Sequence, residues 1–536
     1  WSGLYFTPSS SGSVLDHAVV RYGGGRAATA NVHVQTQDVT ISNSTFAYAN
    51  SYDEGIFFNN ALPTTLIGNT FLNNGGAAVS AELTDNADSI TLSGNTASGN
   101  SVNGLNVQGT LSGTVTWDGD DALPFVVGRS LDYDLAINAG STLILTPGTI
   151  VKFWSDYDDL WVYGTLIADG TATNPIIFTS FKDDTVGGDT NNDSSVSTPT
   201  GGDWSGLYFT PSSSGSVLDH AVVRYGGGRA ATANVHVQTR DVTIHNTTIA
   251  YSDYHAHGLV FDNALPATFT NNTFLNNSEI RAAAYAGLVD NTDSIILSDN
   301  TASGNGMNGL NVYGTISGTV TWDGDDAFPF IVGRTGLNDI TVNAGSTLTL
   351  TPGSIVKFSG DYDDLWVHGT LIAKGTVADP ITFTSFRDDS VGGDTNDDGT
   401  ASSPTGGDWS GLYFAPSSSG SILEYAVVRY GGGRSATANV HVQTRDVAIH
   451  NTTIAHSDYH AHGLVFDNAL PPTFTNNTFL DNSSIRAAAY AGLTDNTDSI
   501  VLSGNTATGN GINGLNVHGT ISGTVTWDGD DAFPFV

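Results

Sequence analysis

Short apolar stretches alternate with polar turns along the whole chain. ANVHVQT at 30–36, DVTIS at 38–42 and TLILTPGTIVKF at 142–153 place an apolar residue at nearly every second position. This period predicts strands of about three to six residues joined by tight turns. Helical periodicity is confined to about two turns, and SSIRAAAYAGL at 483–493 is its best example. The pattern predicts an all-β chain.

The same words return at long and at short intervals. WSGLYF begins at Trp1, Trp204 and Trp409, which divides the chain into unit 1–203, unit 204–408 and the partial unit 409–536. Within the first unit, Asn43, Asn69 and Asn95 lie 26 residues apart, each after a β-branched run. Such a period is typical of a solenoid, since each short coil buries its apolar face against its neighbours. A coil this short has no room for a crossover helix, so successive coils should stack as parallel strands.

The recurring asparagines have a structural explanation. A side-chain amide in a buried turn can hydrogen-bond to its copy one coil above and one coil below, which satisfies polar groups that would otherwise lack partners. We therefore expect asparagine ladders along the stack.

The order of the motifs resembles a known family. PFVVGR, TLILTPGTIVKF, GTLIADGTATNPIIFTS, the loop GGDTNNDSSVSTPTGGDW and then WSGLYF follow one another, and the second unit repeats them. This order is similar to that of bacterial surface proteins of the right-handed parallel β-helix repeat type. The resemblance covers the whole chain. It implies an all-β, right-handed parallel β-helix that is continuous over the chain, and a secreted or cell-surface location; family members include adhesins, stalk modules and polysaccharide-active enzymes.

The charge of the chain limits the classes of partner that it can bind. It has 53 acidic and 17 basic residues, a formal net charge of −36, and no cysteine. Such a chain repels nucleic acid and anionic membranes and attracts cations. Disulfides and thiolate metal sites are excluded, and no apolar run reaches the roughly 18 residues of a membrane span.

Two acidic loops are the candidate metal sites. They occupy 182–203 and 387–408 and should project from the strands, because they lack apolar alternation. The second loop contains D-x-N-x-D-G, whose alternating oxygen ligands and glycine turn favour calcium. Thr405 stands where a calcium loop of this type has a bidentate glutamate, so flanking carboxylates must complete the shell. The first loop has Ser194 in place of the glycine and should bind more weakly. The predicted ligands are Asp189, Asn191, Asp193 and Asp203 in the first loop and Asp388, Asp389, Asp394, Asn396, Asp398 and Asp408 in the second. The alternative is that the loops are solvated acidic insertions.

Other polar clusters have structural explanations beside their functional ones. WDGDD and DYDDLWV carry paired carboxylates of the kind that glycosidases use, yet DG and DD beside strands are also ordinary turns. RYGGGR gives the one similarity to polysaccharide lyases, and its alternative is an arginine–aspartate pair on the surface. The histidine pairs in SDYHAHG could hold a transition metal if i and i+2 share a strand face, or be exposed histidines. The residues of this candidate site are His255, His257, His460 and His462.

The repetition itself favours a structural function. An enzyme needs one distinguished cleft, and here any cleft would occur two or three times. We therefore expect a non-catalytic segment of a long extracellular adhesin, stalk or filament, stabilised by calcium. Its expected partners are copies of itself, joined head to tail or laterally, or polysaccharides of a cell surface. The alternatives are a polysaccharide-degrading lyase or hydrolase and a carbohydrate- or ice-binding module.

Overall fold

A computed structural model describes residues 1–25, 29–119, 122–128, 134–229, 231–325, 327–333, 339–433 and 436–536. Regular structure in these residues is entirely β, as the alternation predicts. The chain divides into two compact units. Unit 1 comprises residues 1–260 and 271–281, and unit 2 comprises residues 261–270 and 282–536.

Around the acidic loop, each coil of unit 1 contributes one short strand to each of three faces of parallel strands. We call them face 1, face 2 and face 3, in chain order within a coil. Just before these coils, the ten-residue strand β13 (Val102–Leu111) pairs with strands of both face 1 and face 2 and joins them in one sheet. Around the acidic loop the strands of face 1 are β15 (Phe125–Val127), β18 (Ile150–Phe153), β21 (Ile176–Ser180) and β24 (Ala221–Arg224). Face 2 has β16 (Leu135–Ile137), β19 (Asp159–Val162), β22 (Gly206–Phe209) and β25 (Ala233–Val237). Face 3 has β14 (Thr114–Asp118), β17 (Thr142–Leu145), β20 (Thr165–Asp169) and β23 (Ser216–Asp219).

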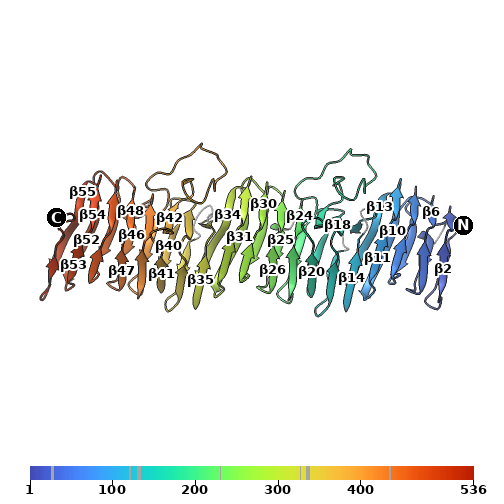
Figure 1. Ribbon diagram of the computed structural model, residues 1–536, viewed down its shortest axis with the longest axis horizontal. Coiled ribbons are helices and arrows are strands. Elements are labelled where there is room, and N and C mark those ends of the chain that lie inside the picture. The colour runs from blue at the N-terminus through green and yellow to red at the C-terminus, as the bar shows by residue number, and fades with distance from the viewer. Residues whose placement is uncertain are drawn as a thin grey trace. The chain divides into compact units, whose positions relative to one another are not determined.

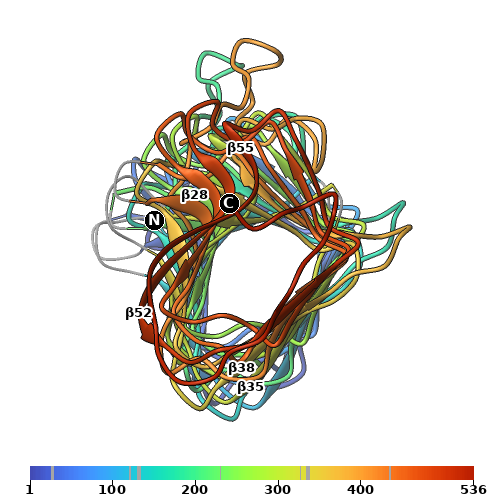
Figure 2. The ribbon, with the colours of Figure 1, turned by 90° about the vertical axis from the view of Figure 1, so that its left-hand side faces the viewer.

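Unit 2 repeats this arrangement. Its face 1 has β39 (Ile355–Phe358), β42 (Ile381–Ser385), β45 (Ala426–Arg429), β48 (Thr453–Ala455), β51 (Thr478–Leu480) and β54 (Thr506–Thr508). Face 2 has β40 (Asp364–Val367), β43 (Gly411–Phe414), β46 (Ala438–Val442), β49 (His462–Asp467), β52 (Ala487–Asn496) and β55 (Ile512–Ile521). Face 3 has β41 (Thr370–Lys374), β44 (Ser421–Glu424), β47 (Val447–His450), β50 (Thr473–Thr475) and β53 (Ile500–Ser503). In the end-on view the coils nearest the viewer, which belong to unit 2, run around a common interior (Figure 2).

The core is built from columns of equivalent residues. In unit 2, Leu365, Leu412, Val440, Leu464, Ala489 and Leu515 stand in register on face 2, each at most 3% exposed. Parallel pairing keeps these inward positions in register, which explains why the period-2 pattern predicts this column. The pairing of β52 with β55 slips elsewhere, between Ala487 and Ala489 and between Leu493 and Asn496.

Asparagine ladders are present, and the structure corrects their membership. Asn69 donates from Nδ2 to Oδ1 of Asn95 at 3.2 Å, and both side chains are buried. Asn43 is outside the ladder: Ser44 takes the ladder position and donates its N–H to Oδ1 of Asn69 at 3.0 Å. Asn43 instead has φ of +46° and bonds to Asp16, because the turn needs a left-handed residue there.

A second ladder was missed in the sequence. Asn74 donates to Oδ1 of Asn100 at 2.7 Å, and Asn31 donates to Oδ1 of Asn74 at 3.1 Å. Asn74 and Asn100 lie 26 residues apart, which is the period of the first ladder, whereas Asn31 lies 43 residues before Asn74, so the period alone indicates only part of this ladder.

The acidic loops join face 1 to face 2. The first runs from the end of β21 to the start of β22, and the second from the end of β42 to the start of β43. Both stand out from the strands of their own unit (Figure 1). Because each leaves and re-enters one coil, the loops interrupt neither sheet.

Candidate metal centre

At the base of each acidic loop, which we call the neck, residues at the end of the preceding strand form hydrogen bonds with an aspartate at the other end of the loop. Asp408 accepts hydrogen bonds from Arg387 Nη1 at 3.0 Å and from Ser385 Oγ at 2.6 Å. Asp203 does the same in the first loop, with Lys182 Nζ at 2.7 Å and Ser180 Oγ at 2.7 Å. Both carboxylates were predicted as metal ligands. The structure places them at the neck with cationic partners, away from the loop centre.

The Trp that follows each loop, at the start of the second and third WSGLYF motifs, packs against the base of the loop from the core side. Trp409 is fully buried, stacks on Phe358 with ring centroids 4.0 Å apart, and donates from Nε1 to Arg429 O at 2.8 Å. Trp204 stacks in the same way on Phe153. The tryptophan therefore fixes where the loop returns to the coil.

Asp388, another predicted ligand, is committed to a buried ion pair. Its Oδ2 lies 2.5 Å from Arg429 Nη2, and Asp183 makes the same contact with Arg224. Asp388 is 1% exposed and also accepts from Thr384 Oγ1. These arginines belong to the RYGGGR motifs, so their alternative explanation as partners of an aspartate holds, although the partner is a loop residue.

Three carboxylates meet at the centre of each loop. In the second loop they come from Asp389, Asp394 and Asp398, with one oxygen of each within 4.8 Å of the others. Asp184, Asp189 and Asp193 form the matching group in the first. Asp184 is absent from the predicted ligands, although its alignment with Asp389 one repeat later would have revealed it.

The D-x-N-x-D-G turn positions two of these residues. Asp394 accepts the N–H of Asp398 at 3.1 Å and that of Gly399 at 2.9 Å. Gly399 has φ of +69°, which a glycine adopts freely, whereas Ser194 must take φ of +58° in the first loop. The glycine therefore makes the second turn the less strained one.

Unpaired oxygens distinguish the two loops. In the second, Oδ1 of Asp389, Asn396 and Asp398 are buried and have no hydrogen-bond partner. In the first, Asp184 Oδ1 is such an atom, whereas Asp193 Oδ1 accepts the N–H of Val196 at 3.0 Å. Burying a carboxylate oxygen without a partner is costly, and a hard cation would satisfy several at once. The donor set of the second loop fits calcium better than that of the first.

A buried lysine on a strand of face 1 donates hydrogen bonds to each loop. Lys357, on β39, is fully buried and donates from Nζ to Gly393 O at 2.9 Å and to Thr395 Oγ1. Lys152, on β18, bonds to Asp183 O, Gly188 O and Thr190 Oγ1. Burial lowers the pKa of Lys357 to about 8, although Asp388, Asp389 and Asp394 oppose the shift. Burial and the neighbouring Asp394 raise the pKa of Asp389, which shows the strain of gathering these charges.

Each loop also reaches back across earlier coils. Asn308 donates its N–H to Thr395 O at 2.7 Å and its Nδ2 to Asp394 O at 3.0 Å, and Gly304 donates its N–H to Asp397 at 2.9 Å. Asn103 makes the equivalent contacts with Thr190 and Asp189. The second loop thus bonds to residues on three other coils of unit 2: those of Asn308, Lys357 and Arg429.

The histidine pairs do not have the geometry on which a metal site was predicted. His255 and His460 lie in the turns before β28 (His257–Asp262) and β49, so neither shares a strand face with the histidine two residues on. His462 Nδ1 already accepts the N–H of Ala487 at 3.1 Å. Among the described residues, no histidine belongs to a group of three potential metal ligands.

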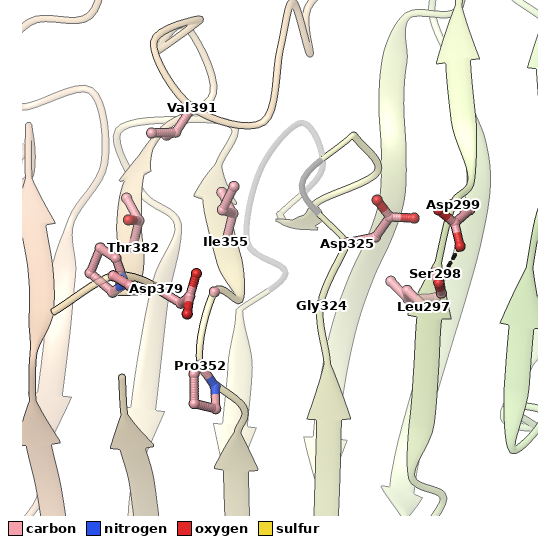
Figure 3. Close-up of a pocket in the computed structure, with 13 residues that line it drawn as sticks. Leu297, Ser298, Asp299, Gly324, Asp325, Pro352, Ile355, Asp379, Thr382 and Val391 are labelled. Carbon is pink, nitrogen blue, oxygen red and sulfur yellow. Dashed lines mark hydrogen bonds between the residues drawn. The ribbon is translucent and has the colours of Figure 1, made fainter. Parts of the chain in front are cut away.

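The other acidic clusters lie where turns meet strands: the first aspartate of WDGDD ends a strand, and the last aspartate of DYDDLWV begins one. Asp325 of the second WDGDD accepts the N–H of Asn300 at 2.7 Å and that of Ala327 at 3.0 Å. With Asp299 and Asp379 it lines a groove of about 550 Å³ in unit 2 (Figure 3). Asp299 is replaced by Gly94 and Asp379 by Asn174 in the first repeat, so the groove is not a repeated carboxylate site. Asp120, Asp121 and Asp326 lie outside the described residues.

In the described part of the chain, no helix is long and apolar enough to cross a membrane.

Comparison with known proteins supports the fold. No curated protein and no solved structure matches the chain. Residues 1–120 match the family model described as right handed beta helix region. The match covers less than half of the chain and, together with the stacked parallel coils, supports a β-helix fold.

Proposed function

We propose that the chain is a non-catalytic structural segment of an extracellular or cell-surface protein, an adhesin, stalk or filament. In this proposal each acidic loop binds a calcium ion and acts as a strap that ties several coils of its unit together. Partners would be copies of the chain or polysaccharides of a cell surface.

One observation carries the proposal. The second loop gathers three carboxylates and leaves Oδ1 of Asp389, Asn396 and Asp398 buried without partners, while its ends and middle bond to three other coils. A cation at this point would neutralise the repulsion between the carboxylates and stabilise the contacts of the loop with the other coils. The same strap recurs 205 residues earlier with the same partners, which favours a repeated mechanical element over a single active site.

Calcium removal tests the strap. We expect the melting temperature to fall when a chelator replaces calcium, since ligand binding to the folded state adds about 2.7 kcal/mol at a hundredfold excess over Kd. Asp398→Asn should remove most of the calcium response, and Asp193→Asn should remove less, because the first loop has fewer unpaired oxygens. Scanning calorimetry with and without calcium measures both.

Asp446→Asn is the matched control, since Asp446 is exposed and lies outside both loops. An unchanged melting temperature after chelation of calcium-loaded protein would contradict the strap. Turnover of an acidic or plant polysaccharide by the purified chain would contradict the non-catalytic assignment. Fibres in electron micrographs would support a filament.

A further inference from the structure

A small recess in unit 2 gathers polar groups that the strap does not use. It has a volume of about 350 Å³ and lies where β49 and β52 begin on face 2. His462, Arg486 and Tyr490 line it, with Val465 and Ile485 as apolar walls. Its size is at the lower end of small-molecule sites.

His462 is held as a neutral hydrogen-bond donor. Its Nδ1 accepts the N–H of Ala487 at 3.1 Å, so the proton of the neutral ring is on Nε2. Its ring stacks on Tyr490 with centroids 4.9 Å apart and 23° between the planes. Burial, with Arg486 beside it, lowers the pKa of His462 to about 4, so the ring is neutral at pH 7.

Arg486 is fixed by one nitrogen and free at the other two. Its Nε donates to His460 O at 3.1 Å. Within the described residues, no carboxylate lies within ion-pair distance of Arg486, and neither the Tyr490 hydroxyl nor His462 Nε2 has a partner. The fork of terminal N–H groups matches the two oxygens of a carboxylate. An unpaired arginine is unusual in a chain with a formal charge of −36.

The preceding repeat builds the same arginine anchor. Arg281 donates from Nε to His255 O at 3.1 Å, the equivalent contact in unit 1. The first repeat instead has Glu54, Gly76 and Ser80 at the positions of His462, Arg486 and Tyr490. The donor set is therefore specific to the second and third repeats, and a general need of the coil does not explain it.

We propose that this recess binds the carboxylate group of a small polar ligand. Arg486 would pair with the two oxygens, while His462 Nε2 and the Tyr490 hydroxyl donate to the ligand. Val465 and Ile485 leave room for an uncharged body beside the carboxylate. Two sources have this chemistry, a sugar acid and the C-terminus of a peptide.

Titration with D-glucuronate, N-acetylglycine and D-glucose tests the proposal, with isothermal calorimetry on the full chain as the measurement. We expect binding of a carboxylate and no binding of glucose, and the tighter of the two acids identifies the source. The double variant Arg281→Gln/Arg486→Gln should weaken carboxylate binding at least tenfold. Arg445→Gln is the matched control, because Arg445 is exposed and pairs with Asp498 away from the recess.

Several results would overturn the proposal. They are binding of glucose as tight as that of glucuronate, no binding of either acid at tens of millimolar, and unchanged binding by the double variant. Circular dichroism melts check that each variant is folded. Asp398→Asn separates this site from the strap, since it should change the calcium response and leave carboxylate binding unchanged.

Discussion

Asn477 shows how a single residue can connect three coils of unit 2. Its fully buried amide donates to Ile449 O at 3.0 Å and to Asn505 Oδ1 at 3.1 Å, while its Oδ1 accepts the N–H of Thr452 at 3.1 Å. Every hydrogen-bonding atom of this side chain is used, so asparagine at this corner satisfies backbone groups that the apolar core cannot.

Asn477→Ala should therefore destabilise unit 2 strongly. The substitution leaves Ile449 O and the Thr452 N–H buried without that partner, which predicts a loss of about 2–4 kcal/mol. Urea unfolding followed by circular dichroism measures it. Thr506→Ala is the control, since Thr506 is exposed and its hydroxyl makes one contact of 3.4 Å. Equal losses in the two variants would show that the ladder contributes nothing special.

At the scale of elements, two acids are buried side by side where the turn before β40 meets the strand. Asp363 is 3% exposed and accepts from Ser359 Oγ at 2.7 Å, and Asp364 is 7% exposed. Burial raises the pKa of Asp363 to about 7, and burial with the neighbouring Asp339 raises that of Asp364 to about 8. The folded turn thus holds protons that the unfolded chain releases near pH 4.

This difference in bound protons determines whether stability rises or falls with pH. Because the folded state binds more protons than the unfolded state between about pH 4 and pH 8, stability falls as pH rises through that range. Asp363→Asn should remove part of the fall, so the variant gains on the order of 2 kcal/mol over the wild type at pH 8 relative to pH 5. Urea midpoints at the two pH values measure the gain. Asp361→Asn, on the exposed neighbour, should show none; a similar gain there would implicate general charge repulsion.

Whether the sequence alone predicts a feature depends on how far apart in the chain the residues that determine it lie. Strands and core positions follow from a period-2 pattern within each segment, so these predictions are confirmed. The partners of Asp388 and Asp408 do not follow from any local pattern. Asp388 meets Arg429 because coil-to-coil register brings a residue 41 positions away beside it, and this places a predicted ligand in an ion pair. Asp184 differs, because it lies in the same loop as Asp189 and Asp193, and its alignment with Asp389 was available in the sequence.

At the scale of the whole molecule, charge opposes the fold. The chain carries 53 acidic and 17 basic residues. In the described ion pairs, several of the basic residues are paired with aspartates of the loops, including Arg429, Arg224 and Lys182. Most of the negative charge therefore lacks a cationic neighbour within the chain, and its mutual repulsion lowers the free energy of unfolding.

Salt should relieve this repulsion, and calcium should do more than salt. Raising NaCl from 0.01 to 0.15 M shortens the screening length from about 30 to about 8 Å, so the melting temperature should rise. CaCl₂ at the same ionic strength should raise it further in the wild type, because the loops add site binding to screening. In the double variant Asp193→Asn/Asp398→Asn the two salts should converge, while the response to NaCl remains. A calcium excess that persists in this variant would place the cation outside the loops, and equal effects of both salts in the wild type would reduce calcium to a screening ion.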